Sequence, residues 1–270
     1  MMVKIGIVGC GTIGKFLAHA IEDRFYPKAC ISCLYDLDLI KAENLAKELR
    51  IKPRIALTLN KLIWHSHLVI ECASLQAVKN IAMQVLKQGR DILIMSVGGI
   101  LECPEILEWA EKYNRKIYIP SGAIGGIDAL HAGSMDKIDS VILTTRKPSH
   151  SFEGAPYILE KGIDLTKIDG EVLLFEGSAE EAIKGFPQNI NVSAILSLVG
   201  IGAKKTIVRI VASPFYTRNI HEIEFEGRFG KFTARIENLP MPENPKTSYL
   251  AALSAVATLE NILGNIKIGT

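Results

Sequence analysis

Short apolar runs and helix-like stretches follow one another along the first 120 residues of the chain. The apolar runs lie at residues 3–8, 30–35, 68–70, 92–95 and 117–119. Between them, apolar residues recur at the spacing of a helix at 13–21, 39–49, 76–87 and 104–113. Strands that alternate with helices predict a parallel sheet with helices on both faces, which also explains why the runs are almost wholly apolar. We therefore predict an α/β domain over residues 1–122.

The pattern changes after about residue 125, where strand-like segments follow one another directly. They cover 140–145, 171–176, 205–212, 221–226 and 231–238, and helical spacing recurs at 178–184, 192–199 and 249–263. Apolar and polar residues alternate within 223–226, which is typical of an antiparallel sheet with one solvated face. We predict a second domain, of α+β type on an antiparallel or mixed sheet, over residues 123–245. For the final segment, 246–270, packing back on the first domain is one arrangement, and the sequence alone does not choose its docking site.

Composition and charge exclude several classes of protein. Of the 270 residues, 48% are hydrophobic and 22% are charged, as in a soluble globular protein. Lys and Arg number 31 against 29 Asp and Glu, and this near-balance argues against a broad nucleic-acid-binding surface. The apolar runs are far shorter than the ~18 residues that span a bilayer. We expect a cytoplasmic protein that binds neither nucleic acid nor a membrane.

The cysteines and histidines form no metal-binding pattern. Five cysteines are an odd number, and without a secretory signal we expect reduced thiols. Cys30 and Cys33 have the spacing of half a zinc site or a redox pair, but residues three apart in a strand point to opposite faces. The chain also lacks an H-x-x-x-H motif, so we predict no metal ion.

A glycine motif marks the turn between the first strand and the first helix. Residues 9–14, with the sequence GCGTIG, match G-x-G-x-x-G at the start of a strand–helix–strand unit. Gly9 permits the tight turn, Gly11 allows the backbone to approach a pyrophosphate, and Gly14 lets helix and strand pack closely. The motif predicts a Rossmann dinucleotide-binding domain. The predicted cofactor-binding residues of this turn are Gly9, Gly11, Thr12, Ile13 and Gly14.

An acidic residue stands where such a domain usually holds a ribose. Asp36 follows the second apolar run, 22 residues after Gly14, close to the ~20 expected for a carboxylate that accepts hydrogen bonds from ribose hydroxyls. Its charge repels a 2′-phosphate, which favours NAD over NADP. The positive charges of Lys15, Lys41 and Arg24 would soften this preference, so we keep both cofactors. The alternative is an ordinary turn in which Asp36 caps the next helix.

Six histidines are candidates for acid–base chemistry near neutral pH. His221 begins a predicted strand of the second domain, and taken alone this position is more typical of a structural histidine than of a catalytic one. The others are His19, His65, His67, His131 and His150, none of which is surrounded by a catalytic motif. The histidines by themselves do not identify a reaction.

Four segments outside the glycine motif resemble one family. Residues 120–126 (PSGAIGG), 186–192 (FPQNINV), 219–221 (NIH) and 243–248 (ENPKTS) resemble the corresponding segments of the prokaryotic L-aspartate dehydrogenases. They occur in the same order as in that family and, with the glycine motif, span nearly the whole chain. The glycine motif is shared by many proteins, whereas these four segments are specific to the family.

The resemblance implies an enzyme that oxidises L-aspartate to iminoaspartate with NAD or NADP, reversibly from oxaloacetate and ammonia. In this family the imine feeds quinolinate and hence NAD biosynthesis. The resemblance also implies that His221 is the catalytic histidine and that Ala123 and Asn191 are further cofactor-binding residues. Two copies would form a homodimer through the second domain.

The chemistry of amine oxidation suits an imidazole at position 221. An ammonium carries no lone pair to assist hydride loss from Cα, so a base must first remove a proton, and an imidazole with a reference pKa of ~6.5 does this near neutrality. We expect Asn191 to hold the nicotinamide carboxamide or the substrate, and backbone N–H groups around Ala123 to fix the ring. The cations available for the substrate carboxylates, among which the sequence does not choose, are Arg146, Lys147, Lys204, Lys205, Arg209, Arg218 and Lys246.

Two other interpretations stay open from the sequence. A related two-domain enzyme, such as a relative of homoserine dehydrogenase or dihydrodipicolinate reductase, would share the glycine motif. A redox sensor that binds a dinucleotide and catalyses nothing would share it too. The polar segments around Asn189 and His221 argue against a sensor, because a sensor needs no proton shuttle.

Overall fold

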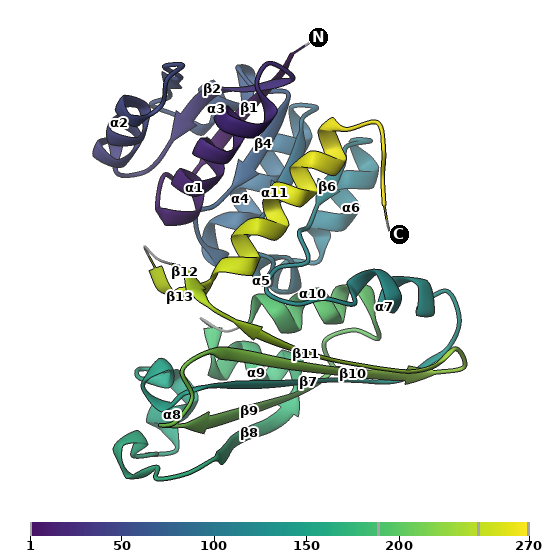
Figure 1. Cartoon of the computed structure of the whole chain (residues 1–270). Helices are drawn as coiled ribbons and strands as arrows, with labels where there is room; N and C mark the ends of the chain where they lie inside the picture. Colours follow the sequence, from purple (N-terminus) through teal and green to yellow (C-terminus); the bar gives the residue numbers. More distant parts are fainter. Residues whose placement is uncertain (1, 188–189, 242–243, 269–270) are drawn as a thin grey trace. The chain divides into compact units, whose positions relative to one another are not determined.

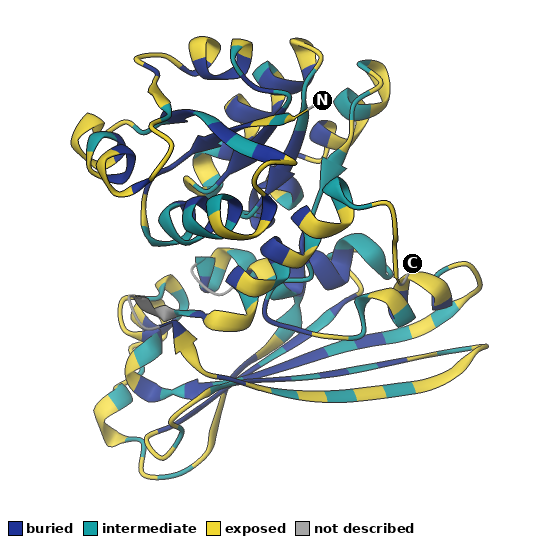
Figure 2. Ribbon diagram, turned by 45° about the horizontal axis from the view of Figure 1, so that its top comes forward, coloured by how far each residue is buried: buried dark blue, intermediate teal, exposed yellow. Residues whose placement is uncertain are grey.

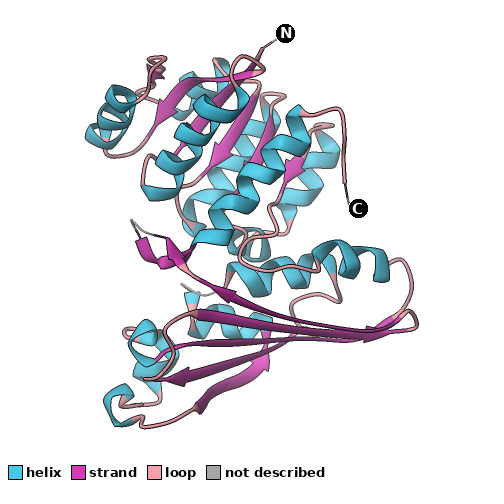
Figure 3. Ribbon diagram, in the orientation of Figure 1, coloured by secondary structure: helices cyan, strands magenta, loops and turns pink. Residues whose placement is uncertain are grey.

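The chain forms two compact units. The computed structural model describes residues 2–187, 190–241 and 244–268, so Gln188, Asn189 and Glu243 of the family-like segments lie outside the described residues. The first unit comprises residues 2–120 and Ala252–Ile268, and the second comprises Ser121–Ala251. Each unit is built on a sheet of its own (Figures 1 and 3).

The sheet of the first unit is parallel throughout, in the order β3-β2-β1-β4-β5-β6. The order reverses between β1 and β4, which is the arrangement of a Rossmann domain, and ligands bind such sheets outside the carboxyl ends of the strands at this reversal. The predicted α/β fold is confirmed. The strands are β1 (Val3–Val8), β2 (Ala29–Tyr35), β3 (Arg54–Ile55), β4 (Leu68–Glu71), β5 (Asp91–Ile94) and β6 (Ile117–Tyr118).

Helices connect these strands and cover both faces of the sheet (Figure 1). They are α1 (Thr12–Ala20), the π-helical turn η1 (Ile21–Phe25), α2 (Leu39–Glu48), α3 (Leu59–Trp64), α4 (Leu75–Lys87), α5 (Gly98–Glu102) and α6 (Glu105–Lys112). Most of the long helix α11 (Tyr249–Leu263) belongs to this unit as well. Its residues Ala255, Val256 and Leu259 are buried in the same apolar cluster as Ile5 and Ile7 of β1.

Parts of the first unit differ from the sequence prediction. β3 has two residues and α3 has six, too few to give a clear hydrophobic period, and neither was predicted. The helix predicted over 104–113 is confirmed as α6, whereas the short helix α5 before it was not predicted. Pro104 precedes α6 and has no N–H, so it cannot continue the hydrogen bonding of α5.

The sheet of the second unit is mixed, in the order β11-β10-β7-β9-β8. β7 and β9 run parallel, and the other neighbours are antiparallel. The predicted α+β fold on an antiparallel or mixed sheet is confirmed, and β10 and β11 form a hairpin. The strands are β7 (Ile138–Pro148), β8 (Val172–Ser178), β9 (Ile207–Ser213), β10 (Asn219–Gly227) and β11 (Gly230–Asn238), with the separate pair β12 (Pro240–Met241) and β13 (Asn244–Ser248).

The two faces of this sheet differ in character. Thr145 of β7 lies opposite His221 of β10, and both side chains are buried. Thr145 lines a small hollow together with the helical residues Ala182 and Ser193, so this is the face that helices cover. The other face is polar, and there Arg146 forms an ion pair with Glu222. Buried and exposed residues alternate along the long strands for this reason (Figure 2). The helical segments of the unit are α7 (Ile127–Gly133), η2 (Ser149–Phe152), α8 (Pro156–Glu160), η3 (Leu165–Lys167), α9 (Ala179–Gly185) and α10 (Asn191–Val199).

Candidate active site

The glycine turn joins β1 to α1 in a conformation that side chains would block. Gly9 has a φ of +94°, and a Cβ there would lie 2.4 Å from the carbonyl oxygen of Cys72. A Cβ on Gly14 would lie 2.0 Å from the carbonyl oxygen of Gly9. Because both contacts are with backbone atoms, which cannot move aside as a side chain can, these positions require glycine.

Gly11 has a different part in the same turn. A Cβ added there would meet no atom of the described residues within 4 Å, so the space in front of it is open. Gly11 is the N-cap of α1 and has no side chain that could cap the helix. The first N–H groups of a helix have no partner within the helix and favour an anion. The turn therefore fits a pyrophosphate, whose place a side chain at position 11 would take.

Asp36 lies beside this turn and contacts it directly. Its Oδ2 accepts a hydrogen bond from the backbone N–H of Cys10 at 2.7 Å, and its Oδ1 accepts one from Asp38 at 2.9 Å. The cap of α2 is Asp38, whose Oδ1 accepts from Ile40, so the alternative that Asp36 caps this helix is wrong. Each carboxylate oxygen has a second lone pair, so Asp36 can still accept from ribose hydroxyls.

A cleft of about 400 Å³ opens in front of the turn, within the size range of ligand pockets. Of the predicted residues of this unit, Gly9, Gly11 and Asp36 line the cleft, whereas Thr12 and Ile13 begin α1 and Gly14 lies against the back of the turn. The full lining is Val8, Gly9, Gly11, Tyr35, Asp36, Leu37, Lys41, Leu59, Cys72, Ala73, Ser74, Ala77, Asn80 and Ile81. Lys41 and Asp36 line the same cleft, so it contains one charge that attracts the 2′-phosphate of NADP and one that repels it.

Glu71 is a polar residue of this region that sequence reasoning did not select. It is fully buried at the carboxyl end of β4, and its carboxylate accepts hydrogen bonds from the N–H of Ala73 at 2.7 Å and from the N–H and Oγ of Ser96 at 3.0 and 2.9 Å. Burial raises the pKa of Glu71. These bonds tie the loop after β5 to the loop after β4, which lines the cleft. An acid directly after an apolar run, as at Asp36, is the signal that could have identified it.

His221 is the buried histidine of the second unit. All six histidines lie in the described part of the chain, and the other five are partly or fully exposed, whereas His221 is 4% exposed. The Oγ1 of Thr145 lies 3.0 Å from His221 Nδ1 and orients the ring. Burial and the positive charge of Lys147 lower the pKa of His221 to about 3. The imidazole is therefore neutral at physiological pH. It is a weaker base than an ordinary imidazole with a pKa of ~6.5, which the sequence analysis assumed.

Lys147 is the second ionisable group near His221. It lies two residues after Thr145 on β7, on the same face of the sheet because side chains alternate along a strand. The residue is 8% exposed, and burial lowers the pKa of its ammonium to about 8. Sequence reasoning included Lys147 among seven cations without selecting it. The side chain of Lys246, another of these, lies outside the described part.

The two predicted cofactor-binding residues of the second unit lie on different elements. Ala123 is buried, and its carbonyl oxygen accepts a hydrogen bond at 2.9 Å from the side chain of Asn238, the last residue of β11. Asn191 is exposed at the first position of α10. The structure therefore fixes the backbone at Ala123 and leaves the side chain of Asn191 at the surface of its unit.

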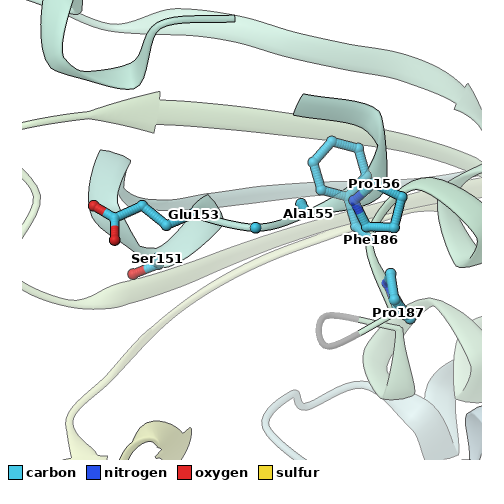
Figure 4. A pocket seen from close by; sticks show the side chains of 7 residues that line it. Ser151, Glu153, Ala155, Pro156, Phe186 and Pro187 are labelled. Carbon is cyan, nitrogen blue, oxygen red and sulfur yellow. The ribbon is translucent and has the colours of Figure 1, made fainter. Parts of the chain in front are cut away.

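A separate hollow lies between η2, α8 and the end of α9 (Figure 4). In the close-up, the ring of Phe186 lies beside Pro156, whereas Ser151 and Glu153 lie together at the other end. Its volume is about 30 Å³. A single water needs ~10–15 Å³ on this scale, so the hollow is too small for an amino acid.

The described residues, 2–187, 190–241 and 244–268, contain no helix that is both long and apolar enough to cross a membrane. Within the same ranges, no three His, Cys, Asp or Glu side chains gather in a way that could hold a metal ion. All five cysteines are free thiols.

Comparisons with known proteins match both halves of the chain. Residues 9–120 match the family model described as homoserine dehydrogenase, NAD binding domain, and residues 128–262 match the model described as aspartate dehydrogenase, C-terminal. A protein named L-aspartate dehydrogenase from Methanosarcina mazei is 49% identical over the full length of both chains. The chain belongs to the L-aspartate dehydrogenase family. A relative of the same name from Nitrosopumilus maritimus is 40% identical, again over both full lengths.

Solved structures agree with this membership. The crystal structure of aspartate dehydrogenase from Thermotoga maritima superposes with a TM-score of 0.74 at 28% identity and covers 100% of both chains. A homoserine dehydrogenase from Thiobacillus denitrificans has a TM-score of 0.62 at 14% identity, covering 97% of this chain and 73% of that one, which shows a shared fold alone. The segment specific to the L-aspartate dehydrogenase family, 128–262, is the one that contains Asn191 and His221.

Proposed function

We propose that this chain oxidises L-aspartate to iminoaspartate with NAD or NADP as the hydride acceptor, and catalyses the reverse reaction from oxaloacetate and ammonia. The observation that carries the proposal is His221, a buried neutral imidazole held by Thr145 within the segment that matches the aspartate dehydrogenase model. The high identity to relatives named L-aspartate dehydrogenase supports the choice of substrate.

His221 is the catalytic base in this proposal. A neutral imidazole can accept the proton of the substrate ammonium, which frees the nitrogen lone pair that assists hydride loss from Cα, and it can return the proton in the reverse direction. Thr145 positions the ring through its hydroxyl. The weak basicity of His221 in the free protein means that substrate binding has to raise its pKa.

The first unit is the dinucleotide-binding domain in this proposal. The residues that hold the cofactor are Gly9, Gly11, Thr12, Ile13, Gly14 and Asp36, with the pyrophosphate at the open position in front of Gly11 and a ribose at Asp36. When bound, the nicotinamide supplies the hydride acceptor. Ala123 and Asn191, from the second unit, contact the nicotinamide end, and the fixed carbonyl of Ala123 favours a preorganised contact.

The second unit binds the substrate and forms a homodimer in this proposal. Its sheet keeps one polar face that described helices do not cover, on which Arg146, Glu222 and Arg235 form ion pairs, and a second copy placed there would make the same contacts in return. We further propose a cytoplasmic enzyme whose imine product feeds quinolinate and NAD biosynthesis. Sedimentation of the purified protein at twice the chain mass would support the dimer.

The proposed reaction is tested by the absorbance of the reduced nicotinamide after purified protein is mixed with L-aspartate and NAD or NADP. D-aspartate, L-glutamate and L-homoserine are the controls, the last because residues 9–120 match a homoserine dehydrogenase model. Reduction with L-aspartate alone supports the proposal. Reduction with L-homoserine alone assigns a different substrate, and NADH binding without turnover on any of these compounds assigns a sensor.

A further inference from the structure

A second ionisable side chain shares the buried face on which His221 lies. The register of β7 and β10 sets Thr145 directly opposite His221, and Lys147 is the next residue of β7 on that face. A residue and the diagonal neighbour of its cross-strand partner have Cβ atoms ~7–8 Å apart, within reach of a long side chain. The Lys147 ammonium can therefore reach the space in front of the His221 ring.

The other charged groups of these strands lie elsewhere. Arg146 and Glu222 are on the opposite face, where they form an ion pair, and Arg209 of β9 pairs with Glu176 on that same face. On the face of His221, the neighbouring strand positions carry no charge: Asn219 and Asn238 are polar, and Leu143, Val208, Ile210, Ile223 and Ile236 are apolar. The covering helix α10 contains no charged residue, and the charged residues of α9, Glu180, Glu181 and Lys184, are exposed.

We propose that Lys147 binds a carboxylate of the substrate beside the catalytic base His221. This inference rests on the proposed function, because it takes a dicarboxylic amino acid as the ligand. A buried cation is stabilised when an anion enters its surroundings, and an ammonium–carboxylate hydrogen bond is stronger than one between neutral groups. Lys147 thus supplies a positive charge for a carboxylate beside the proposed base.

Carboxylate binding at Lys147 also changes the base. The positive charge of Lys147 is one of the two causes that lower the pKa of His221. A bound carboxylate offsets that charge, so the pKa of His221 rises towards the working pH when the substrate arrives. An amino acid that places no carboxylate at Lys147 leaves His221 a weak base. Lys147 therefore couples recognition of the acid group to proton transfer.

The first test replaces the charge. We expect Lys147→Met to raise the KM for L-aspartate about 10- to 100-fold, the range of a hydrogen bond to a charged group. In the same variant, the acid limb of the kcat/KM profile moves to higher pH, because the pKa of His221 in the free enzyme rises when the neighbouring cation is removed. Lys147→Arg keeps the charge, so its KM should lie closer to that of the wild type than the KM of Lys147→Met. A lysine that only lowers the pKa of His221 and does not bind the substrate would move the acid limb without the rise in KM.

The matched control is Lys231→Met, which removes a lysine charge from the open face of the same sheet, where Lys231 pairs with Glu224. It should leave both the KM and the acid limb unchanged. An unchanged KM and an unchanged acid limb in Lys147→Met would overturn the proposal. Inhibition by succinate and by propionate then shows which substrate carboxylate Lys147 binds. If Lys147→Met loses affinity for both inhibitors, Lys147 binds the carboxylate that they share. If it loses affinity for succinate alone, Lys147 binds the second carboxylate.

A measurement on the unaltered protein keeps the inference testable if the variants do not fold. Succinate is titrated calorimetrically into the NADH-bound protein at pH 8 to 9, in buffers of different ionisation enthalpy. Because burial lowers the pKa of Lys147 to about 8, part of the lysine is neutral there and has to take up a proton to bind an anion. Proton uptake supports the site, and binding without uptake, or no binding, overturns it. Wild-type turnover of L-aspartate is measured separately, so its absence reports on the proposed function alone.

Discussion

The glycine turn of the first unit and the β7–β10 strand pair of the second each prepare a place for a ligand, with different parts of the chain. In the turn, the backbone makes the place: Gly9 and Gly14 bring segments into contact, and Gly11 leaves the space in front of α1 open. In the strand pair, side chains make it. Thr145 and His221 are 76 residues apart in the chain and meet through strand register under covering helices.

This difference predicts how each region responds to change. A backbone-built site is sensitive to any added atom at certain positions, and its function is binding. A site built from buried side chains is sensitive to the identity of its ionisable groups, and proton transfer is its role in the proposed reaction. Substitutions in the two regions should therefore separate cofactor binding, folding and chemistry from one another.

The largest effect should come from removing the imidazole. We expect His221→Ala to lower kcat for L-aspartate oxidation about 10²- to 10⁴-fold, the usual contribution of a general base, with unchanged affinity for NADH. Steady-state assays measure kcat, and fluorescence titration measures the affinity for NADH. His131→Ala, which removes an exposed imidazole from α7 of the same unit, is the control and should keep wild-type turnover. Near wild-type kcat in His221→Ala would remove the residue from the mechanism.

Two glycines of the turn should respond in opposite ways to the same methyl group. Gly14→Ala forces a Cβ to 2.0 Å from a backbone oxygen, and we expect it to lower the free energy of unfolding by about 1–3 kcal/mol, as overpacking does. Gly11→Ala meets open space, so we expect almost unchanged stability but about 10-fold weaker NADH binding, or ~1.4 kcal/mol. Urea unfolding and NADH titration separate the two. Equal stability losses would contradict the division of roles.

The buried imidazole should also make folding depend on pH. The pKa of His221 is about 3 in the folded chain, below its ordinary value of 6.5, so the unfolded state binds more protons between these values. Stability from this group is therefore lost as the pH falls through that window, by about 2 kcal/mol between pH 7 and pH 5. Urea unfolding at several pH values measures the slope. His221→Gln should flatten it, and an unchanged slope would mean that other groups cause it.

The smallest expected effect concerns the choice of cofactor. Asp36→Asn removes the charge that repels a 2′-phosphate while keeping an oxygen for the N–H of Cys10. We expect the ratio of kcat/KM for NADP over NAD to rise about fivefold, as for ~1 kcal/mol of a solvent-exposed charge interaction. Asp38→Asn, at the cap of α2, is the control and should leave the ratio unchanged. A ratio unaltered in Asp36→Asn would place the discrimination elsewhere.

The fold was largely predictable because its strands carry strong local patterns. Apolar runs gave the long strands of the first unit, and alternation gave β10 and β11. The glycine turn was predictable as well, because the positive φ at Gly9 favours glycine and the glycines can be seen in the sequence. β3 and α3 were missed because two and six residues are too short for a period to appear.

The neighbours of His221 could not be predicted, because they depend on register between distant strands. Thr145 had no signal of its own, and Lys147 was one cation among seven until β7 placed it on the face of His221. Glu71 was missed because its partners, Ala73 and Ser96, come from the ends of two strands. The low pKa of His221 is likewise a property of burial, which an isolated residue in a sequence does not reveal.

The place of α11 has a consequence for the order in which the protein is made. Residues 2–120 emerge from the ribosome long before Ala255, Val256 and Leu259 are synthesised, and these three residues fill the apolar cluster beside β1. The nascent first unit must therefore wait with an uncovered apolar surface while the whole second unit emerges, a state in which unfinished chains are prone to aggregate. A gene fragment that ends at residue 120 would perpetuate that state, so the nucleotide-binding half is better expressed with α11 joined to it by a short linker.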